Sequence, residues 1–447
     1  MTFPRYPNYK ASGFTWLGDV PEHWQLKRLG HYFDERRERA SDTEFEPLSV
    51  TKLGIVPRLE SAAKTQDGDN RKKVLAGDFV INSRSDRKGS SGLSPLDGSV
   101  SLICTVLIPT GLHGPFIHHL FRSELFQEEY YRWGKGIVAD LWSTNFSDMK
   151  NIVLGVPSEA EQTQIARFLD HETARIDALI EEQQRLIELL KEKRQAVISH
   201  AVTKGLDPTV PMKDSGVEWL GEVPAHWDVK ALRYLGECQN GINIGGDAFG
   251  SGSPFVSYGD VYKNEVLPVE VAGLVQSSPE DRQRYSVKAG DVFFTRTSET
   301  VEEIGFSATC LQDLPDAVFA GFLIRFRPAG KSIDPKFSKY YFRNQGLRIF
   351  FNKEMNLVTR ASLSQDLLKL LPVTLPPVTE QIKIADFLDR VIAEFASLLE
   401  QGLRSIDLLT ERRSALISAA VTGKIDVRGW QPPVSTQAPK FEVAEAV

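Results

Sequence analysis

The sequence lacks the features that place a chain in a membrane or outside the cell. Its 447 residues contain no run of 18 apolar residues, so no membrane-spanning helix is expected. The N-terminal stretch 1–14 has no apolar signal core, which argues against export. The three cysteines Cys104, Cys238 and Cys310 are far apart and odd in number, which favours buried thiols in a reducing compartment. We therefore expect a cytoplasmic protein without membrane contact.

Motifs of catalysis and of metal binding are also missing. A phosphate-binding loop ending at Gly330-Lys331-Ser332 would need a glycine where Arg325 stands. The stretch FGSG at 249–252 has no Asn-Pro-Pro-aromatic motif elsewhere to complete a methyltransferase site. The isolated pair His118-His119 lies on an expected helix, where neighbouring side chains diverge, so a structural role is favoured over metal ligation. The sequence therefore indicates a binding or scaffold protein, not an enzyme, with no metal or cofactor of its own.

A long repeated segment organises the chain. Residues 157–207 match residues 376–426 at an offset of 219, with Glu-Gln, Ile-Ala and Phe-Leu-Asp at equivalent places in both copies. Apolar residues recur at steps of three, four or seven, which is typical of a coiled-coil seam. Prolines precede each copy and Gly205 or Gly423 follows it, so each copy predicts a helix of about 44 residues and roughly 65 Å.

Matching seams predict that the two helices pack against each other rather than separately on their own domains. Gly402 interrupts the second helix near its middle, where glycine costs about 1 kcal/mol against alanine. Two interpretations stay open for this glycine: a close approach of the partner helix near Gln183, its counterpart in the first copy, or a tolerated bend.

A second repeat opens each globular segment. WLGDVPEHW at 16–24 returns as WLGEVPAHW at 219–227, an offset of 203. These Trp and Pro residues offer little titratable chemistry, so a packing plug is favoured over a ligand platform. The repeating unit is thus a turn motif, a globular domain and a long helix, used twice.

Each globular domain is predicted to be a mixed α/β domain of short strands and one helical region. We expect strands at 46–50, 74–82 and 99–108 and a helix at 116–133 in the first domain. The second domain repeats this order, with strands at 255–257, 287–295, 305–310 and 319–326 and a helix at 335–351. The predicted boundaries are 1–156 and 206–375 for the domains, 157–205 and 376–426 for the helices, and 427–447 for a flexible tail.

Two polar loops follow the strand that both domains share. They read NSRSDRKGSSG at 82–92 and TRTSETVEEIG at 295–305. The two loops differ in sequence, although the strands that precede them are similar. Arginine, asparagine and hydroxyl side chains read the edges of bases, so two unlike loops would read two unlike sequences. The candidate DNA-binding residues are Asn82, Ser83, Arg84, Ser85, Arg87, Lys88, Thr295, Arg296, Thr297 and Ser298. The alternative for Arg296 is an internal ion pair with Glu299 or Glu302.

Basic clusters add possible phosphate contacts, although the net charge of −6 argues against a generic nucleic-acid-binding surface. The stretches 71–88 and 325–353 are both rich in lysine and arginine, and aromatic residues alternate with them in the second. Lys339 and Arg343 are the candidates that we take from it. The alternative is an ordinary solvated helix face.

The doubled motifs resemble the specificity subunit of Type I restriction-modification systems. The resemblance rests on Pro-x-x-x-Glu-Gln-x-x-Ile-Ala-x-Phe-Leu-Asp at Pro157 and Pro376, on Trp-Leu-Gly-x-Val-Pro at Trp16 and Trp219, and on the Gly-Asp units at 77 and 290. It covers nearly the whole chain, from about residue 15 to 426. It implies an α+β fold in which two similar target recognition domains are joined by two long antiparallel coiled-coil helices, related by a pseudo-two-fold repeat.

The same resemblance implies a function. Each domain would read one half of a bipartite site on double-stranded DNA, and the helices would set the gap between the halves. Two modification (methyltransferase) subunits would dock on the helices, and restriction subunits would join them. S-adenosylmethionine, ATP and Mg²⁺ would belong to those partners. Two other functions stay open: a coiled-coil scaffold that reads no DNA, and a methyltransferase with its own cofactor site.

Overall fold

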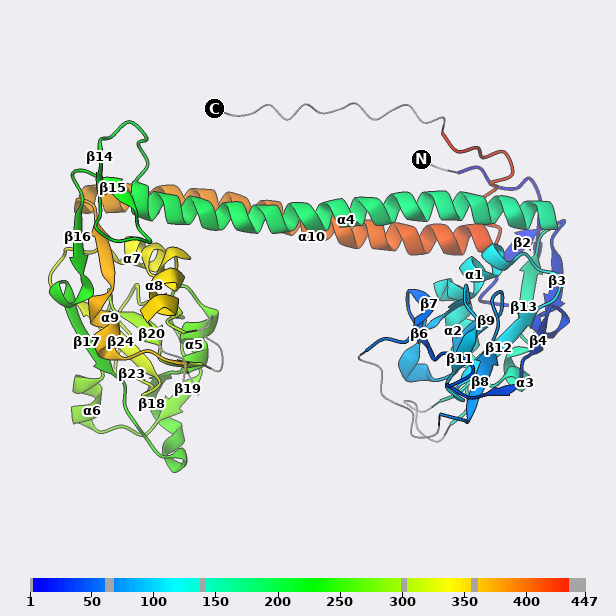
Figure 1. The fold of residues 1–447 in the computed structure, drawn as a ribbon, viewed down its shortest axis with the longest axis horizontal. Helices are drawn as coiled ribbons and strands as arrows, with labels where there is room; N and C mark the ends of the chain where they lie inside the picture. Colours follow the sequence, from blue (N-terminus) through cyan, green and yellow to red (C-terminus); the bar gives the residue numbers. More distant parts are fainter. Residues whose placement is uncertain (1–2, 61–67, 137–141, 299–303, 355–360, 434–447) are drawn as a thin grey trace. The chain divides into compact units, whose positions relative to one another are not determined.

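The computed structural model describes residues 3–60, 68–136, 142–298, 304–354 and 361–433. The chain forms two compact units (Figure 1). The first unit comprises Met1–Gln184 and Arg404–Val447, and the second comprises Arg185–Leu403. The long helices α4 (Glu159–Lys204) and α10 (Val378–Val421) are therefore each divided between the two units.

The first unit is built on an antiparallel sheet in the order β10-β9-β12-β4. The same unit also contains a three-stranded sheet, β11-β8-β5, and the hairpin β6-β7. The strands of these sheets are β4 (Phe33–Glu35), β5 (Arg39–Ala40), β6 (Leu48–Thr51), β7 (Gly54–Pro57), β8 (Arg71–Val74), β9 (Phe79–Asn82), β10 (Ser91–Leu93), β11 (Gly98–Val100) and β12 (Cys104–Pro109).

Two smaller pairs connect this domain to its long helix. β1 (Tyr9–Ala11) pairs with β2 (Asp19–Pro21), and β3 (Gln25–Arg28) pairs with β13 (Val153–Val156), which leads into α4. The helices of the domain are α1 (Gly114–Arg122), α2 (Glu124–Arg132) and α3 (Phe146–Met149).

The second unit repeats this topology. Its central sheet has the order β17-β24-β20-β22, so β20 takes the place of β9, and β24 takes the place of β12. The equivalent small pairs are β14-β15 and β16-β26. The strands are β14 (Met212–Asp214), β15 (Glu222–Pro224), β16 (Asp228–Ala231), β17 (Gly236–Asn240), β18 (Phe249–Val256), β19 (Gly273–Val275), β20 (Val292–Thr295), β21 (Thr297–Ser298), β22 (Ser307–Thr309), β23 (Val318–Phe319), β24 (Leu323–Pro328), β25 (Ala361–Ser362) and β26 (Pro372–Leu375).

The predicted α+β class and the internal repeat are confirmed, but several predicted elements are divided. The strand expected at 74–82 is β8 and β9 with a turn between them, where Gly77 has a φ of 94° that favours glycine. The helix expected at 116–133 breaks at Ser123, whose hydroxyl accepts from the amide of Phe126 and starts α2. In the second unit the helix expected at 335–351 is α7 (Pro335–Tyr341) and α8 (Gly346–Glu354), followed by α9 (Gln365–Leu370). The helices α5 (Tyr258–Lys263) and α6 (Pro279–Arg284) fall between predicted strands.

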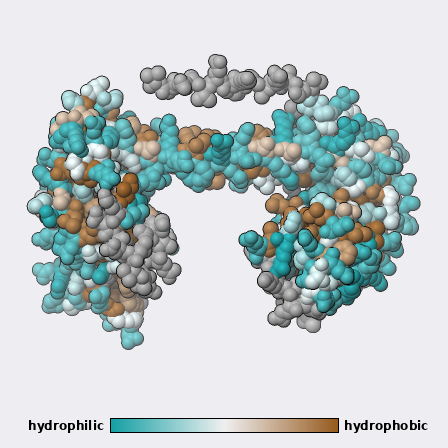
Figure 2. All heavy atoms as spheres, in the orientation of Figure 1, coloured by the Kyte–Doolittle hydropathy of each residue, from teal (hydrophilic) through white to brown (hydrophobic). Residues whose placement is uncertain are grey.

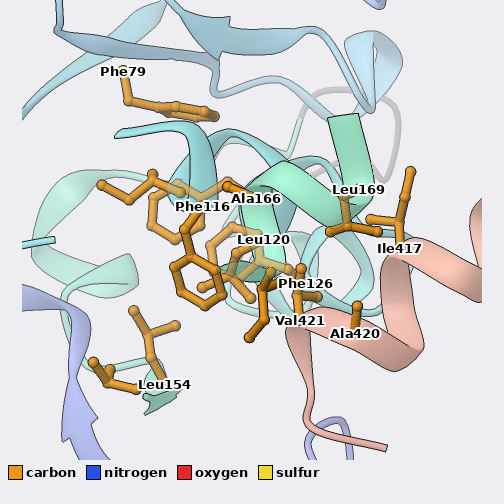
Figure 3. Close-up of a cluster of buried hydrophobic side chains, with 14 of the residues drawn as sticks. Phe79, Phe116, Leu120, Phe126, Leu154, Ala166, Leu169, Ile417, Ala420 and Val421 are labelled. Carbon is orange, nitrogen blue, oxygen red and sulfur yellow. The ribbon is translucent and has the colours of Figure 1, made fainter. Parts of the chain in front are cut away.

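The long helices pack against each other and run antiparallel within each unit. In the first unit the beginning of α4 and the end of α10 share one hydrophobic core with α1 and α2 (Figure 3). Asp177 of α4 accepts from Arg413 of α10 at 2.8 Å. In the second unit the end of α4 shares a core with the beginning of α10.

Gly402 marks a close approach of the two helices in the second unit. A Cβ at this position would lie 3.0 Å from Cγ1 of Ile187 in α4, a side chain that is itself buried. The close-approach interpretation is therefore correct, and the contact is Ile187, one helical turn after Gln183. Ile187 is also the seam residue here, because its neighbour Leu186 is 46% exposed.

The repeated Trp-Pro motif closes the C-terminal end of each long helix. Trp24 and Trp227 are fully buried. Gly423, just after α10, lies against Pro21 and Trp24, and Gly205, just after α4, lies against Trp227. Both glycines have positive φ, as a left-handed helix stop requires. The packing-plug interpretation is thus confirmed.

The chain beyond α10 is less free than predicted. Val427 is 1% exposed, and the Trp430 ring packs on Phe168 at 5.3 Å between ring centroids. The predicted tail boundary at 427 is therefore wrong for residues 427–430, and residues 434–447 lie outside the described part. No described helix combines the length and apolar character needed to cross a membrane.

Candidate nucleic-acid interface

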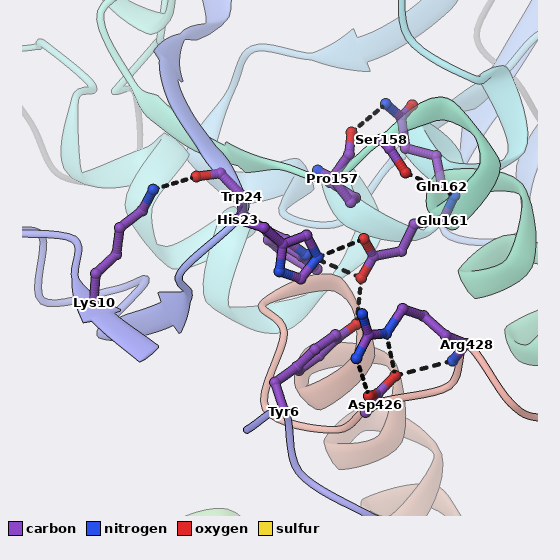
Figure 4. A network of polar contacts seen from close by, with 10 residues as sticks. All are labelled: Tyr6, Lys10, His23, Trp24, Pro157, Ser158, Glu161, Gln162, Asp426 and Arg428. Atoms are coloured by element: carbon purple, nitrogen blue, oxygen red, sulfur yellow. Dashed lines mark hydrogen bonds and ion pairs between the residues drawn. The ribbon is translucent and has the colours of Figure 1, made fainter. Parts of the chain in front are cut away.

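The repeated glutamate of the long helices fastens each helix to its domain. In the first unit, Tyr6 donates its hydroxyl to Glu161 Oε1 at 2.6 Å, and Trp24 donates Nε1 to the same oxygen at 3.1 Å (Figure 4). His23 Nε2 lies 2.8 Å from Glu161 Oε2. Burial, together with this carboxylate, raises the pKa of Tyr6 far above its ordinary value. In the second unit, the equivalent Glu380 binds His226 Nε2 at 2.8 Å.

The repeated glutamine and aspartate complete this junction. Gln162 Oε1 accepts from the amide of His113 at 2.9 Å, and Gln381 Oε1 accepts from the amide of Asp334 at 2.8 Å, so these glutamines hold the N-termini of α1 and α7. Asp170 Oδ1 lies 2.7 Å from His119 Nε2. The structural role predicted for the histidine pair fits these contacts, and burial lowers the pKa of His118 to about 4.

Lys339 belongs to the same junction in the second unit. Its Nζ donates to Asp389 Oδ1 at 2.6 Å, its side chain is 15% exposed, and it lies over the Tyr340 ring. Tyr340 donates its hydroxyl to Asp389 as well. Lys339, a predicted phosphate contact, is thus the counterpart of the His119 region and joins the domain to α10.

Arg343 is also occupied inside the domain. Its Nε donates to the carbonyl of Ser307 at 2.6 Å, and its Nη2 donates to the carbonyls of Val261 and Asn264. Burial lowers the pKa of its guanidinium. These contacts organise loops of the second unit, so we leave Arg343 out of the proposed interface.

Most basic side chains of the stretches 71–88 and 325–353 also bind groups within their own domain. Arg71 is buried against Ser99, Lys72 donates to the carbonyl of Cys104, and Arg327 forms a bidentate pair with Asp291. Arg325 is 6% exposed and donates to the carbonyl of Ser286. A local excess of basic residues in the sequence therefore does not mark a basic surface here, because carbonyls and carboxylates from distant segments satisfy the cations.

The polar loop of the first unit has a fixed base and a more open tip. Asn82 and Ser83 are buried, with Asn82 Oδ1 accepting from the amide of Arg84 at 3.2 Å and Ser83 Oγ donating to the carbonyl of Ile103. The amide of Ser85 donates to the carbonyl of Trp142 at 3.0 Å. The side chains of Asn82 and Ser83 therefore stabilise the loop and are not accessible to a ligand.

The tip of this loop carries the accessible cation. The Arg87 side chain is 67% exposed and lies only loosely beside Asp86, at 3.6 Å. Arg84 and Ser85 are half-buried. Lys88 is 42% exposed and pairs with Glu128 of α2. Arg87 is the side chain in this group that is best placed to reach a ligand.

The polar loop of the second unit begins from the equivalent strand. Thr295 is fully buried, whereas Arg296 and Thr297 are half-buried. Glu299 and Glu302, the alternative ion-pair partners of Arg296, lie outside the described residues. Thr297 and Ser298 form β21, which pairs with β25, and the Ser298 side chain is outside the description.

Sequence reasoning missed exposed apolar residues beside both loops. Ser83 donates its amide to the carbonyl of Ile103 at 3.2 Å, and Arg296 donates its amide to the carbonyl of Phe322 at 3.0 Å. Ile103 directly precedes β12 and is 41% exposed, and Phe322 directly precedes β24 and is 64% exposed. Each domain therefore sets an exposed apolar side chain beside its polar loop, at the same place in the repeated sheet.

The sequence indicates only weakly that Ile103 and Phe322 are exposed. An apolar residue just before a buried strand reads as part of that strand, and its exposure is decided by the turn that precedes it. Trp142, which is 39% exposed and bonds the loop through its carbonyl, gave no periodic signal at all.

The thiols and candidate metal ligands are scattered. Cys104 and Cys310 are buried and Cys238 is half-buried, and burial raises the pKa of Cys104 to about 12. Within the described ranges, no group of three His, Cys, Asp or Glu residues could hold a metal ion.

Comparison with known proteins gives one consistent family. The Type I restriction modification DNA specificity domain matches residues 224–406. The specificity subunit of the EcoKI enzyme of Escherichia coli K12 is 26% identical over 408 residues, which is 88% of this chain and 82% of that protein. The StySPI specificity subunit of Salmonella potsdam is 22% identical over 402 residues, with the same coverage of both chains.

Solved structures agree on the fold. The HsdS subunit from Thermoanaerobacter tengcongensis superposes with a TM-score of 0.56 at 18% identity, covering 91% of this chain and 98% of that one. A chain from a study of complex assembly and conformational transition in a type I R-M system superposes with a TM-score of 0.64, also at 18% identity, covering 90% and 98%. The matched domain, the relatives and the twice-repeated fold together confirm the resemblance of this chain to the specificity subunits of Type I restriction-modification systems.

Proposed function

We propose that this protein reads a bipartite, asymmetric site on double-stranded DNA, with one half-site for each globular domain. The observation that carries the proposal is the repeated sheet, in which β9 and β20 end in polar loops at the same register. The loops differ in sequence while the frame is shared. Two similar sheets that carry different loops are the arrangement expected of two domains that recognise different DNA sequences.

Some side chains of each loop stabilise the loop, and others are proposed to contact DNA. Asn82, Ser83 and Thr295 are buried and hold the loops in shape. The proposed contacts are Arg84, Ser85, Arg87 and Lys88 in the first domain and Arg296, Thr297 and Ser298 in the second. Arginine can bind guanine with two hydrogen bonds, and hydroxyls bond several bases.

The exposed neighbours Ile103 and Phe322 extend this surface. An apolar side chain beside an arginine suits contact with the methyl group of thymine or with a sugar. Both types of contact would then come from the same edge of the central sheet in each domain.

The helices α4 and α10 would set the distance between the half-sites and dock two modification subunits, which restriction subunits would join. This chain would supply no catalytic group. S-adenosylmethionine, ATP and Mg²⁺ would act on the partner subunits. Isothermal titration of the chain alone with S-adenosylmethionine should therefore give no binding, and saturable binding would favour a methyltransferase instead.

Methylome sequencing of cells that carry this chain with its modification partner tests the main proposal. We expect a split motif of two unequal halves. Arg296→Ala should relax or abolish one half and leave the other unchanged, and Arg87→Ala should act on the opposite half. A continuous motif, or equal damage to both halves from either substitution, would contradict the proposal.

The scaffold alternative predicts a different result. If the chain reads no DNA, replacement of Arg84 and Arg87 by alanine leaves DNA binding by the assembled complex untouched. The specificity domain matched at residues 224–406 argues against that alternative.

A further inference from the structure

The two repeats differ at one equivalent aromatic position on their long helices. Phe168 of α4 and Phe387 of α10 both belong to the repeated Phe-Leu-Asp sequence. Phe168 is fully buried, whereas Phe387 is half-buried and lines an open groove. The same residue in the same repeat is therefore covered in one unit and uncovered in the other.

In the first unit the ends of the chain cover this position. The Phe3 ring meets Phe168 edge-on at 5.1 Å, and the Trp430 ring meets it edge-on at 5.3 Å, both measured between ring centroids. His171, one turn further along α4, contacts Trp430 at 5.2 Å. Gln164, one turn before Phe168, donates its amide to the carbonyl of Val427 at 3.1 Å and also bonds the carbonyl of Trp430.

In the second unit the equivalent surface is a groove of about 750 Å³. Its lining includes Leu189, Ala196, Val197 and Leu206 around Phe387. Hydrophobic side chains also reach the surface along the two helices in Figure 2, and Leu189 is 52% exposed. The connecting segment that follows α4, residues 206–211, reads LDPTVP and contains no aromatic residue to fill the groove.

Basic residues occupy, in the second unit, the repeat positions that contact the chain ends in the first unit. The positions equivalent to Gln164 and His171 are Lys383 and Arg390, and both are exposed. Lys193 and Glu192 line the groove. A ligand segment that replaced Phe3 and Trp430 here would therefore meet Lys383 and Arg390 in place of Gln164 and His171, which favours acidic residues beside its aromatic side chain.

We propose that the Phe387 groove receives an aromatic side chain from an acidic segment of a modification subunit. The inference rests on the proposed function, which places such subunits on α4 and α10. A second copy of this chain is a poor source, because its Phe3 and Trp430 are already packed on Phe168. A partner aromatic would complete in the second unit the packing that the chain's own ends complete in the first.

The test uses the full chain and its purified modification subunit, with binding measured by isothermal titration. Ala196→Trp fills the groove from an exposed position that should not disturb folding. Phe387→Ala removes its aromatic wall. We expect each substitution to weaken binding of the modification subunit at least tenfold while DNA binding by the chain is unchanged.

Ala415→Trp is the matched control, because Ala415 is the exposed equivalent of Ala196 in the first unit. We expect at most a twofold effect there. Equal loss of binding in both tryptophan variants, or none in Ala196→Trp and Phe387→Ala, would overturn the inference and leave the proposed function intact. A wild-type chain that binds no modification subunit would overturn both.

Hydrogen exchange identifies the occupant of the groove. Exchange over 189–206 should slow only when the modification subunit is added. Protection that is already present in the chain alone, and that disappears on truncation after Pro433, would assign the groove to the chain's own C-terminal residues and overturn the inference.

Discussion

At the scale of single residues, the repeated polar motif of the long helices is an anchoring device. Glu161, Gln162 and Asp170 bind side chains and amides of the first domain, and their equivalents bind the second domain. These contacts explain why polar residues recur at identical places in two otherwise divergent halves. They also show that Lys339 is occupied by Asp389 rather than free for DNA.

The Asp389 carboxylate makes a pH-dependent contribution to stability. Burial opposes its ionisation, but hydrogen bonds from Lys339 and Tyr340 outweigh burial and hold the pKa of Asp389 below its usual value. A lowered folded-state pKa stabilises the protein above the unfolded pKa of about 3.9, and this stabilisation is lost as the pH falls through the folded pKa.

Asp389→Asn should therefore lower the free energy of unfolding by about 1 kcal/mol at neutral pH, since partial exposure weakens the pair. The difference from wild type should shrink below about pH 4. Urea unfolding at several pH values measures both effects. Asp366→Asn, at a side chain that is 94% exposed, is the control and should change little. An effect of Asp389→Asn that grew on acidification would contradict the assignment.

Arg87 and Arg343 should separate DNA contact from structural support. Arg87→Ala should weaken specific DNA binding by about 1–3 kcal/mol and leave thermal stability unchanged, because its side chain is exposed. Arg343→Ala should instead lower stability, because it leaves several carbonyls without their donor. Fluorescence anisotropy with target DNA and thermal unfolding distinguish the two.

Arg37→Ala, at a side chain that is 80% exposed in the same domain, provides the baseline for nonspecific charge loss. Equal loss of affinity in Arg37→Ala and Arg87→Ala would remove Arg87 from the interface.

At the scale of elements, α4 and α10 owe their length to tertiary packing. Many positions on both helices are exposed, and pairing supplies the buried seam that such long helices need in water. The contact between Ile187 and Gly402 fixes which turns face each other in the second unit. A change in length must therefore be made in both helices to preserve the pairing.

A matched insertion tests the role of the helices as a spacer. Seven residues added within 186–194 of α4, and seven within the facing stretch 395–403 of α10, keep the heptad seam in phase and add about 10 Å. We expect the unread gap of the target motif to grow by about three base pairs, at roughly 3.4 Å per step. Methylome sequencing measures the gap. An unchanged gap in an active complex would show that the helices do not set it.

At the scale of the whole molecule, the N-terminal segment is hydrogen-bonded to the segment that follows α10. The amide of Asp426 donates to the carbonyl of Pro4 at 2.8 Å, and Lys424 Nζ donates to the carbonyl of Leu17 at 3.0 Å. In the second unit Lys204 Nζ makes the equivalent bond to the carbonyl of Leu220 at 2.9 Å. The contacts that follow α10 across the two termini thus match those that follow α4 along a continuous chain.

Circular permutation should therefore be tolerated. A chain with Pro433 linked to Phe3 by a flexible linker and new ends between Thr209 and Val210 should keep its fold, because residues 206–209 are exposed. We expect a melting temperature within a few degrees of the parent and unchanged assembly with the modification subunit. A permutant opened between Pro21 and Glu22, inside the buried plug, is the control and should lose stability.

Local signals in the sequence predicted the repeat, the two long helices and the plug, because periodicity, proline and left-handed glycine act locally. The end of the second helix was less accurate, since α10 ends at Val421 and not at the predicted 426. The sequence also located the two loops, since both follow the shared strand. The split of residues 74–82 into β8 and β9 escaped it, because a tight turn at Gly77 interrupts the apolar pattern without ending it.

The accessibility of the polar side chains depends on how the chain folds. The residue types of Arg343, Lys339 and Ser83 suggest ligand contacts, but carbonyls and a carboxylate distant in sequence bind their side chains. Asn82 is buried and accepts from the amide of Arg84. Ile103 and Phe322 look like core residues, but the turns before β12 and β24 leave them exposed. The difference between Phe168 and Phe387 likewise arises only where the chain ends pack. Burial and pairing depend on neighbours brought together by folding, and periodicity along the chain carries no record of them.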